Sequence, residues 1–278
     1  MNEPAAPFGK PLFLDINSLD FSVAYALTDR ATLTLTLPFS HGTHSRFYAD
    51  QVRHKVKGFG LGDISLVGSA WLLNPETQQN GNISLGLGIK VPSGDNKVTD
   101  DFFNADGSVV QRPVDQSIQL GDGGWGILLQ VQAYRRVFAR ANAYLSGSYL
   151  LSPRKITDVP SPLPGVMLSV PDVYTARGGL AYLLWPTQGV SVSLGGRLDG
   201  IPLRDLIGGG DDGFRRPGFI LYLDPGMAVQ RGRDEFSLSL PIRIHQDFRQ
   251  SLIDREKNFR GGGDLADFLL FAGYTHRF

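Results

Sequence analysis

In Asn82-Ile83-Ser84-Leu85-Gly86-Leu87-Gly88-Ile89-Lys90-Val91, an apolar residue occupies every second position and small or polar residues lie between. Successive side chains of a strand point to opposite sides, so this alternation is typical of a strand with one apolar and one polar face. The pattern recurs at 31–39, 190–199 and 235–245. The sequence therefore predicts a protein built from strands of about ten residues.

Eleven such strands can be traced, and the segments that connect them alternate between short and long. Short turns on one rim and long loops on the other are the arrangement of a transmembrane β-barrel, whereas a soluble β-sandwich has no reason to sort its loops in this way. We expect short turns near 28–30, 74–81, 135–139, 186–188 and 231–233, and long loops over 40–60, 93–123, 152–172, 200–217 and 246–264. The predicted strands span 18–27, 31–39, 61–73, 82–92, 124–134, 140–151, 173–185, 190–199, 218–229, 235–245 and 265–278.

The fold class that follows is all-β: a single domain, 1–278, forming an antiparallel up-and-down transmembrane β-barrel of about 12 strands. Barrels of this kind have an even number of strands, so one strand is unaccounted for. We expect residues 3–15 to pair poorly as a strand because Pro4, Pro7 and Pro11 cannot donate backbone hydrogen bonds. We expect 1–17 to be irregular or a partial strand, and the first strand of a 12-stranded parent to be missing. The start also lacks the pattern of a signal peptide.

Composition agrees with a barrel. Hydrophobic residues make up 42% of the chain, the mean hydropathy is −0.09, and no apolar run reaches the 18 or so residues that a spanning helix needs. Barrel strands are apolar on one face, so their average hydropathy is moderate. The 27 basic and 27 acidic residues balance, which gives no reason to expect a nucleic-acid partner.

The last predicted strand carries an independent signal. Apolar residues occur at alternate positions up to a terminal phenylalanine, Phe278, as in the signal read by the outer-membrane assembly machinery. We therefore expect a bacterial outer-membrane location, with that machinery (through Phe278) and outer-membrane lipid as partners. Tyrosine and tryptophan near predicted strand ends would form an interfacial girdle: Tyr25, Tyr149, Tyr182, Trp185 and Tyr274.

Alternation also places charged residues on the side opposite the apolar one. A charge facing hydrocarbon would cost about 2–4 kcal/mol, so these residues mark the predicted lumen. They could form a polar constriction that selects solutes, or a salt-bridge network that stiffens a closed barrel. The candidates are Asp20, Asp63, Lys90, Arg177, Arg197, Asp199, Arg243, His245, Asp267 and Arg277.

Other motifs do not indicate catalysis. Gly60-Leu61-Gly62-Asp63 precedes a predicted strand, not the helix that a phosphate loop requires. The glycine–aspartate segments 208–213 and 261–264 lack the regular ligand spacing of a calcium loop. The five histidines lack a metal-binding spacing. We expect no cofactor, no metal and no catalytic residues.

Four glycine-rich segments resemble a known family: Gly60–Leu66, Val91–Asp95, Ser117–Gly126 and Gly213–Gly218. They are similar to the outer-membrane proteins grouped with the phenol meta-cleavage degradation pathway, which are described as transporters, and the resemblance covers roughly 18–278. It implies porin-like, passive uptake of a small-molecule solute, including aromatic or hydrophobic compounds. Two other functions stay open: a plugged structural or adhesion barrel acting through its loops, and an outer-membrane lipid hydrolase.

Overall fold

A computed structural model describes residues 12–161, 163, 165–207, 213–259 and 266–278. Antiparallel strands dominate it, and eleven follow one another across a single sheet. β3 (Arg53–Leu61) pairs with β2, and β16 (Ile242–Phe248) pairs with β14, which completes the 13-stranded sheet. The eleven, in sheet order, are β1 (Phe13–Ala26), β2 (Ala31–Phe47), β4 (Ile64–Trp71), β5 (Gly81–Val91), β8 (Gly126–Phe138), β9 (Ala141–Leu151), β12 (Val173–Trp185), β13 (Val190–Ile201), β14 (Gly218–Arg231), β15 (Asp234–Ser239) and β17 (Phe271–His276).

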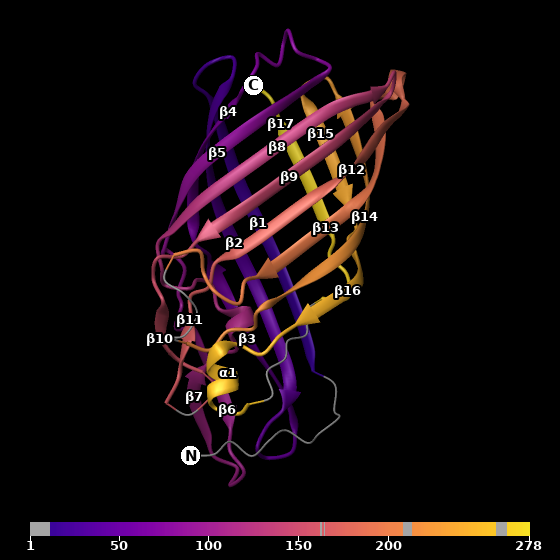
Figure 1. Cartoon of the computed structure of the whole chain (residues 1–278). Coiled ribbons are helices and arrows are strands. Elements are labelled where there is room, and N and C mark those ends of the chain that lie inside the picture. The colour runs from indigo at the N-terminus through magenta and orange to yellow at the C-terminus, as the bar shows by residue number, and fades with distance from the viewer. Residues whose placement is uncertain (1–11, 162, 164, 208–212, 260–265) are drawn as a thin grey trace.

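The sheet curls into a half-barrel whose strands are steeply tilted (Figure 1). Helix is confined to short segments: η1 (Gln116–Ile118), η2 (Pro186–Gln188) and α1 (Leu252–Glu256). In the described part of the chain, no helix has both the length and the apolar character needed to cross a membrane. The predicted all-β, up-and-down antiparallel architecture is confirmed.

Each of the eleven predicted strands corresponds to one position in the sheet. Three of them are interrupted. In the one predicted over 265–278, an isolated bridge at Phe268 is separated from β17 by Leu269 and Leu270. The predicted strand 235–245 is divided at Leu240 and Pro241 into β15 and β16, because proline has no N–H to offer to a neighbouring strand. Gly62 and Asp63 separate β3 from β4 (Ile64–Trp71). The predicted strand 61–73 is therefore shorter than expected.

The expectation of a loop over 40–60 is wrong. Of the segment 1–17, expected to be irregular or a partial strand, residues 13–17 form the start of β1. β2 continues to Phe47 and pairs with the start of β1 from Phe13↔Ser45 to Ser18↔Ser40, and β3 covers its other edge. This extension lacks hydrophobic alternation because its side chains face other loops rather than lipid; Thr43, for example, is buried. Residues 13–15 belong to β1 and so are not part of a separate twelfth strand over 3–15. Residues 1–11 lie outside the described residues.

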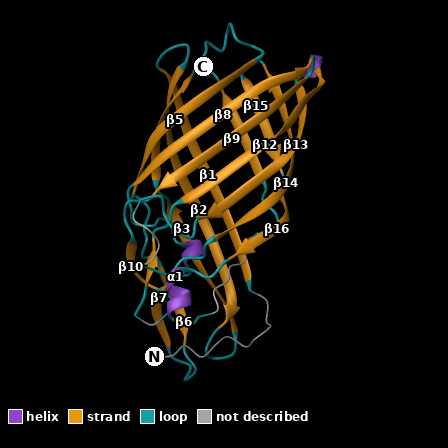
Figure 2. Cartoon of the chain, viewed as in Figure 1, coloured by secondary structure: helices purple, strands orange, loops and turns teal. Residues whose placement is uncertain are grey.

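The long connections gather at one end of the sheet and the short turns at the other, where the chain ends (Figure 2). We call these the loop end and the turn end. At the loop end, β6 (Thr99–Phe103) pairs with β7 (Val109–Pro113), and β10 (Ile156–Pro160) pairs with β11 (Met167–Ser169). Apolar side chains hold these loops together in two clusters, one around Val56 and Ile118 and one around Leu168 and Phe214.

The outer face of the sheet is covered with exposed aliphatic side chains. Leu87 is 63% exposed, and its cross-strand neighbour Leu129 is 40% exposed. A surface of this size and character is normally covered by a partner or by lipid. It continues around the strands through Leu35, Leu85, Leu145, Leu180, Leu194, Leu223, Met227 and Leu238.

We predict that Leu87→Arg destabilises the protein in lipid by about 2–4 kcal/mol, because it places a charge against hydrocarbon near the middle of a strand. The matched control is Gln130→Arg, on the next strand but facing inward, which should change the free energy of unfolding far less. Urea titration in lipid vesicles, followed by heat-modifiable migration on a gel, measures both. Equal effects at the two positions would contradict the assignment of the faces.

Candidate functional site

The inner face of the sheet is lined by hydroxyl, amide and glycine residues. Ser22 and Thr36 approach to 3.0 Å between their hydroxyl oxygens across β1 and β2, as do Ser18 and Ser40 to 3.1 Å. A hollow of about 200 Å³ lies against this face in the middle of the strands. Polar walls of this kind can be wetted, unlike an apolar cavity. The hollow is lined by Thr34, Thr36, Ser65, Val67, Ser69, Ser84, Gly86, Gln130 and Gln132.

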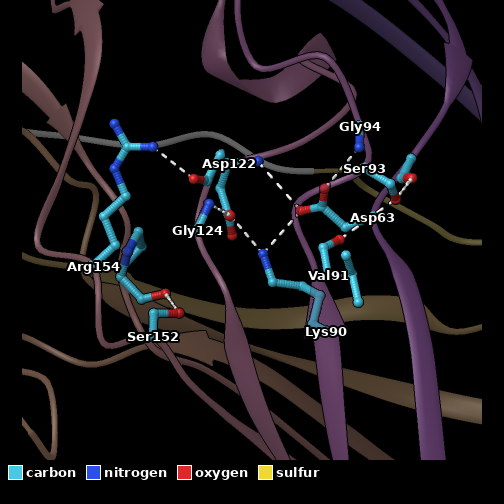
Figure 3. A network of polar contacts seen from close by, with 12 residues as sticks. Asp63, Lys90, Val91, Ser93, Gly94, Asp122, Gly124, Ser152 and Arg154 are labelled. Atoms are coloured by element: carbon cyan, nitrogen blue, oxygen red, sulfur yellow. Dashed lines mark hydrogen bonds and ion pairs between the residues drawn. The ribbon is translucent and has the colours of Figure 1, made fainter.

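Toward the loop end, Lys90 lies between two carboxylates (Figure 3). Its Nζ donates to Asp63 Oδ2 at 2.8 Å and to Asp122 Oδ1 at 2.5 Å. Backbone N–H groups complete the set: Gly94 donates to Asp63 Oδ1 at 3.0 Å, and Gly124 donates to Asp122 Oδ1 at 2.8 Å. The Lys90 and Asp63 side chains are each 10% exposed, so this cluster joins the end of β5 to two connecting segments in a largely buried setting.

Two further hydrogen-bonded links extend the cluster (Figure 3). Ser93 Oγ donates to the Gly62 carbonyl at 2.9 Å and accepts from the Ile64 N–H at 2.8 Å. Arg154 Nη1 donates to the Gly123 carbonyl at 2.6 Å. Three of the four glycine-rich segments singled out in the sequence therefore meet at one place, as part of the framework that holds the loops.

Deeper in the lumen, Arg177 pairs with Asp224. The Asp224 side chain is fully buried, and its Oδ1 also accepts a hydrogen bond from Ser239 Oγ at 2.6 Å. The Arg177 guanidinium lies 5.5 Å from the centre of the Tyr144 ring, close enough for a cation–π contact. The charge of this buried carboxylate is therefore neutralised by one cation, and one hydroxyl adds a hydrogen bond.

Most of the other predicted lumen residues are also paired. Arg197 Nε donates to Asp199 at 2.8 Å, Arg243 pairs with Asp267, and Arg277 approaches Glu235 at 3.5 Å near the turn end. For Asp20, no ion pair is found within the described residues; it shares the inner face of β1 with Ser18 and Ser22.

The expectation that His245 faces the lumen is wrong. A register shift between Leu221 and Tyr222 makes His245 the partner of Leu221, whereas Arg243 is the partner of Tyr222. Partners in an antiparallel pair share a face, so His245 lies on the outer face, 5.8 Å from the Phe219 ring. The extra residue in β16, Ile244, is a β-bulge, which reverses the alternation that follows it.

Several charged groups of the interior were missed from the sequence. Asp224 has inward parity with Tyr222 but is followed by Pro225, which hides the strand pattern. A second set lies in the loops, where no periodicity exists to reveal it: Arg215 clamps Asp205 at 2.6 and 2.7 Å. The fully buried Asp172 accepts from Tyr149 Oη at 2.9 Å and from backbone N–H groups.

Beneath the loops lies a hollow with a volume of about 550 Å³. This loop-end cavity lies within the range of about 300–1,000 Å³ typical of small-molecule sites. Its lining is apolar on one part and charged on another, and the fourth glycine-rich segment contributes to it. It is lined by Leu12, Leu14, His44, Asp63, Asn96, Asp115, Gln116, Ser117, Gln119, Gly121, Asp122, Thr157, Val159, Leu168, Pro171, Val173, Asp199, Gly200, Ile201, Arg215, Arg216, Gly218 and Phe248.

Electrostatics at one part of this cavity are set by His44, Asp115 and Arg216. Burial lowers the pKa of His44 below 6.5 against the opposing charge of Asp115, so the imidazole is neutral at pH 7. Burial alone would raise the pKa of Asp115. The N–H of Ser117 and the charge of Arg216 nevertheless hold it below 3.8, so this carboxylate is ionised.

A known structure shares this fold. An outer-membrane channel from Pseudomonas putida F1 superposes with a TM-score of 0.54 at 17% sequence identity, over 86% of this chain and 80% of that one. A FadL homologue from Pseudomonas aeruginosa gives a TM-score of 0.45 at 10% identity, over 84% of this chain and 61% of that one. No protein-family model and no curated protein matches the sequence. The likeness to the Pseudomonas putida channel shows that this chain has the fold of an outer-membrane β-barrel.

We predict that Lys90→Met destabilises the protein by about 3 kcal/mol, because two largely buried carboxylates would lose their common cation. The control Arg249→Met removes the exposed pair with Asp247 and should cost less than about 0.5 kcal/mol. Urea unfolding in lipid vesicles compares them. Similar small losses for both variants would show that the cluster contributes little to stability.

Proposed function

We propose that this chain is a channel of the bacterial outer membrane that passes small solutes passively, without a cofactor. The observation that carries the proposal is the contrast between the two faces of one sheet. Its outer face is aliphatic, as at Leu87, while its inner face is polar and borders two hollows. Since open barrels of this architecture are water-filled conduits, the inner face supplies a path and the outer face its position in lipid.

The charge distribution of the lumen supports passage of small molecules rather than of one type of ion. Arg177, Arg197 and Arg243 each have an aspartate partner, so little unbalanced charge is left to attract or repel ions. The apolar part of the loop-end cavity, including Val159, Leu168 and Ile201, supports solutes with an aromatic or hydrophobic portion. This agrees with the uptake role implied by the resemblance to proteins grouped with phenol meta-cleavage.

A closed adhesion barrel is the second candidate, and the packing of the loops favours it. Lys97 in one loop pairs with Asp158 in another, and Arg154 adds a contact to Asp158 at 3.3 Å. The hydrogen bond from Lys97 lowers the pKa of Asp158 to about 2, so this tie persists at any physiological pH. Such ties would hold the loop end shut if they did not open for solutes.

Conductance of the purified protein in planar bilayers separates the two candidates. A channel gives discrete current steps in KCl. We expect a small unitary conductance because the packed loops narrow the path at the loop end. Lys97→Met, which releases the tie to Asp158, should lengthen the open time. Absence of steps in both proteins, with the fold intact, would favour the closed barrel.

Selectivity should respond to Arg197 and Asp199 with opposite signs. Arg197→Ala leaves Asp199 unpaired and should shift ion preference toward cations, whereas Asp199→Asn leaves Arg197 unpaired and should shift it toward anions. The double variant should return close to the wild type. Reversal potentials in a KCl gradient measure these shifts. If both single variants behave as the wild type does, this pair does not line the solute path.

A further inference from the structure

The loop-end cavity differs from the rest of the lumen in having both an apolar wall and a cation that is weakly engaged. The apolar wall is formed by Val159, Leu168, Val173 and Ile201, from β10, β11, β12 and β13. The cation is Arg216, whose side chain is 39% exposed. An apolar surface with a few polar groups at one end is the usual design of a small-molecule site.

Arg216 is held loosely compared with the other cations around the cavity. Its Nη2 lies 4.0 Å from Asp115, whereas Lys90 and Arg215 approach their carboxylates at 2.5–2.8 Å. Its Nε is buried and has no hydrogen-bond partner among the described residues. A buried N–H without an acceptor is costly, so this guanidinium has donors to offer to a ligand.

The acceptors around the cavity are largely occupied. Asp63 and Asp122 accept from Lys90 and from backbone N–H groups. Asp199 accepts a hydrogen bond from Arg197 through Oδ2. Its Oδ1 is an exception: it is buried, and no hydrogen-bond partner is found for it among the described residues. A ligand that brings acceptors therefore fits this cavity better than one that brings donors.

The local charge balance leads to the same conclusion. The charges of Asp115, Arg46 and Arg216 all act on His44, which burial keeps neutral. Of the two guanidinium groups, Arg216 lines the cavity, whereas Arg46 acts on Tyr48 together with the carboxylates of Asp100 and Asp115. A cation beside the apolar wall favours an anion.

We propose that the loop-end cavity binds a small organic acid, in which a compact apolar body carries a single carboxylate. The carboxylate would accept hydrogen bonds from the Arg216 guanidinium, and the apolar body would lie against Val159, Leu168, Val173 and Ile201. Arginine suits this role because its planar fork matches a carboxylate. The proposal names the substrate class of the channel and in that sense rests on the proposed function.

Benzoate and its uncharged isostere benzamide test the proposal by isothermal titration of the full chain in lipid nanodiscs. We expect benzoate to bind at least tenfold more tightly than benzamide. Arg216→Met should remove that difference, Arg216→Lys should retain part of it, and Arg249→Met, an exposed arginine that does not line the cavity, should leave it unchanged. Heat-modifiable migration on a gel shows that each variant is folded.

Equal affinities for benzoate and benzamide in the wild type would overturn the proposal, as would binding of neither compound or a preference for benzoate that survives in folded Arg216→Met. These results are independent of conductance. Tight benzoate binding without channel steps would refute the proposed channel and leave the site intact. Channel steps without a preference for benzoate would refute the proposed binding site and support the channel.

Discussion

Backbone hydrogen bonding in lipid is the constraint on which the rest of this structure depends. Hydrocarbon offers no partner to an N–H or C=O group, so the strands must satisfy one another around a curved sheet. From β2 to β15, each strand of the eleven has neighbours along both edges. In the described residues, β1 pairs with β2 and β17 pairs with β15, and the other edge of each has no strand partner. Backbone N–H and C=O groups without a strand partner are therefore concentrated at these two edges of the described sheet.

The same constraint divides the side chains into two populations. Side chains on the outer face meet hydrocarbon and are therefore aliphatic, while inward positions must avoid both a dry void and an unpaired charge. The lumen satisfies the second requirement at three arginines, since Arg177, Arg197 and Arg243 each have an aspartate partner. Serine, threonine and glutamine fill the remaining inner positions and leave space that water can occupy.

Sequence could predict the strands because period-two alternation is a direct record of the two faces. The alternation alone predicts that Leu85, Leu87 and Ile89 share one face. It also places Asp63 and Lys90 on the same side, and these two side chains are in contact in the structure. The alternation fails where one residue is inserted, and so the bulge at Ile244 reversed the expected side of His245. It also fails in the loops. Arg215 and Asp205 pair tightly there, but a contact between two irregular segments leaves no periodic trace.

Those loop contacts explain why the cavity has a defined composition although it lies among connections. Arg215 is 2% exposed and divides its guanidinium between Asp205 and Ser169, so most of its hydrogen-bonding capacity goes to holding two loops in register. Arg216, the next residue, has a different partner, Asp115, at 4.0 Å. Because Arg215 is fixed, it sets the position of the neighbouring Arg216, whose guanidinium keeps hydrogen-bond donors for a ligand. The glycine-rich segment 213–218 therefore both anchors the loop end and positions the group that a solute would meet there.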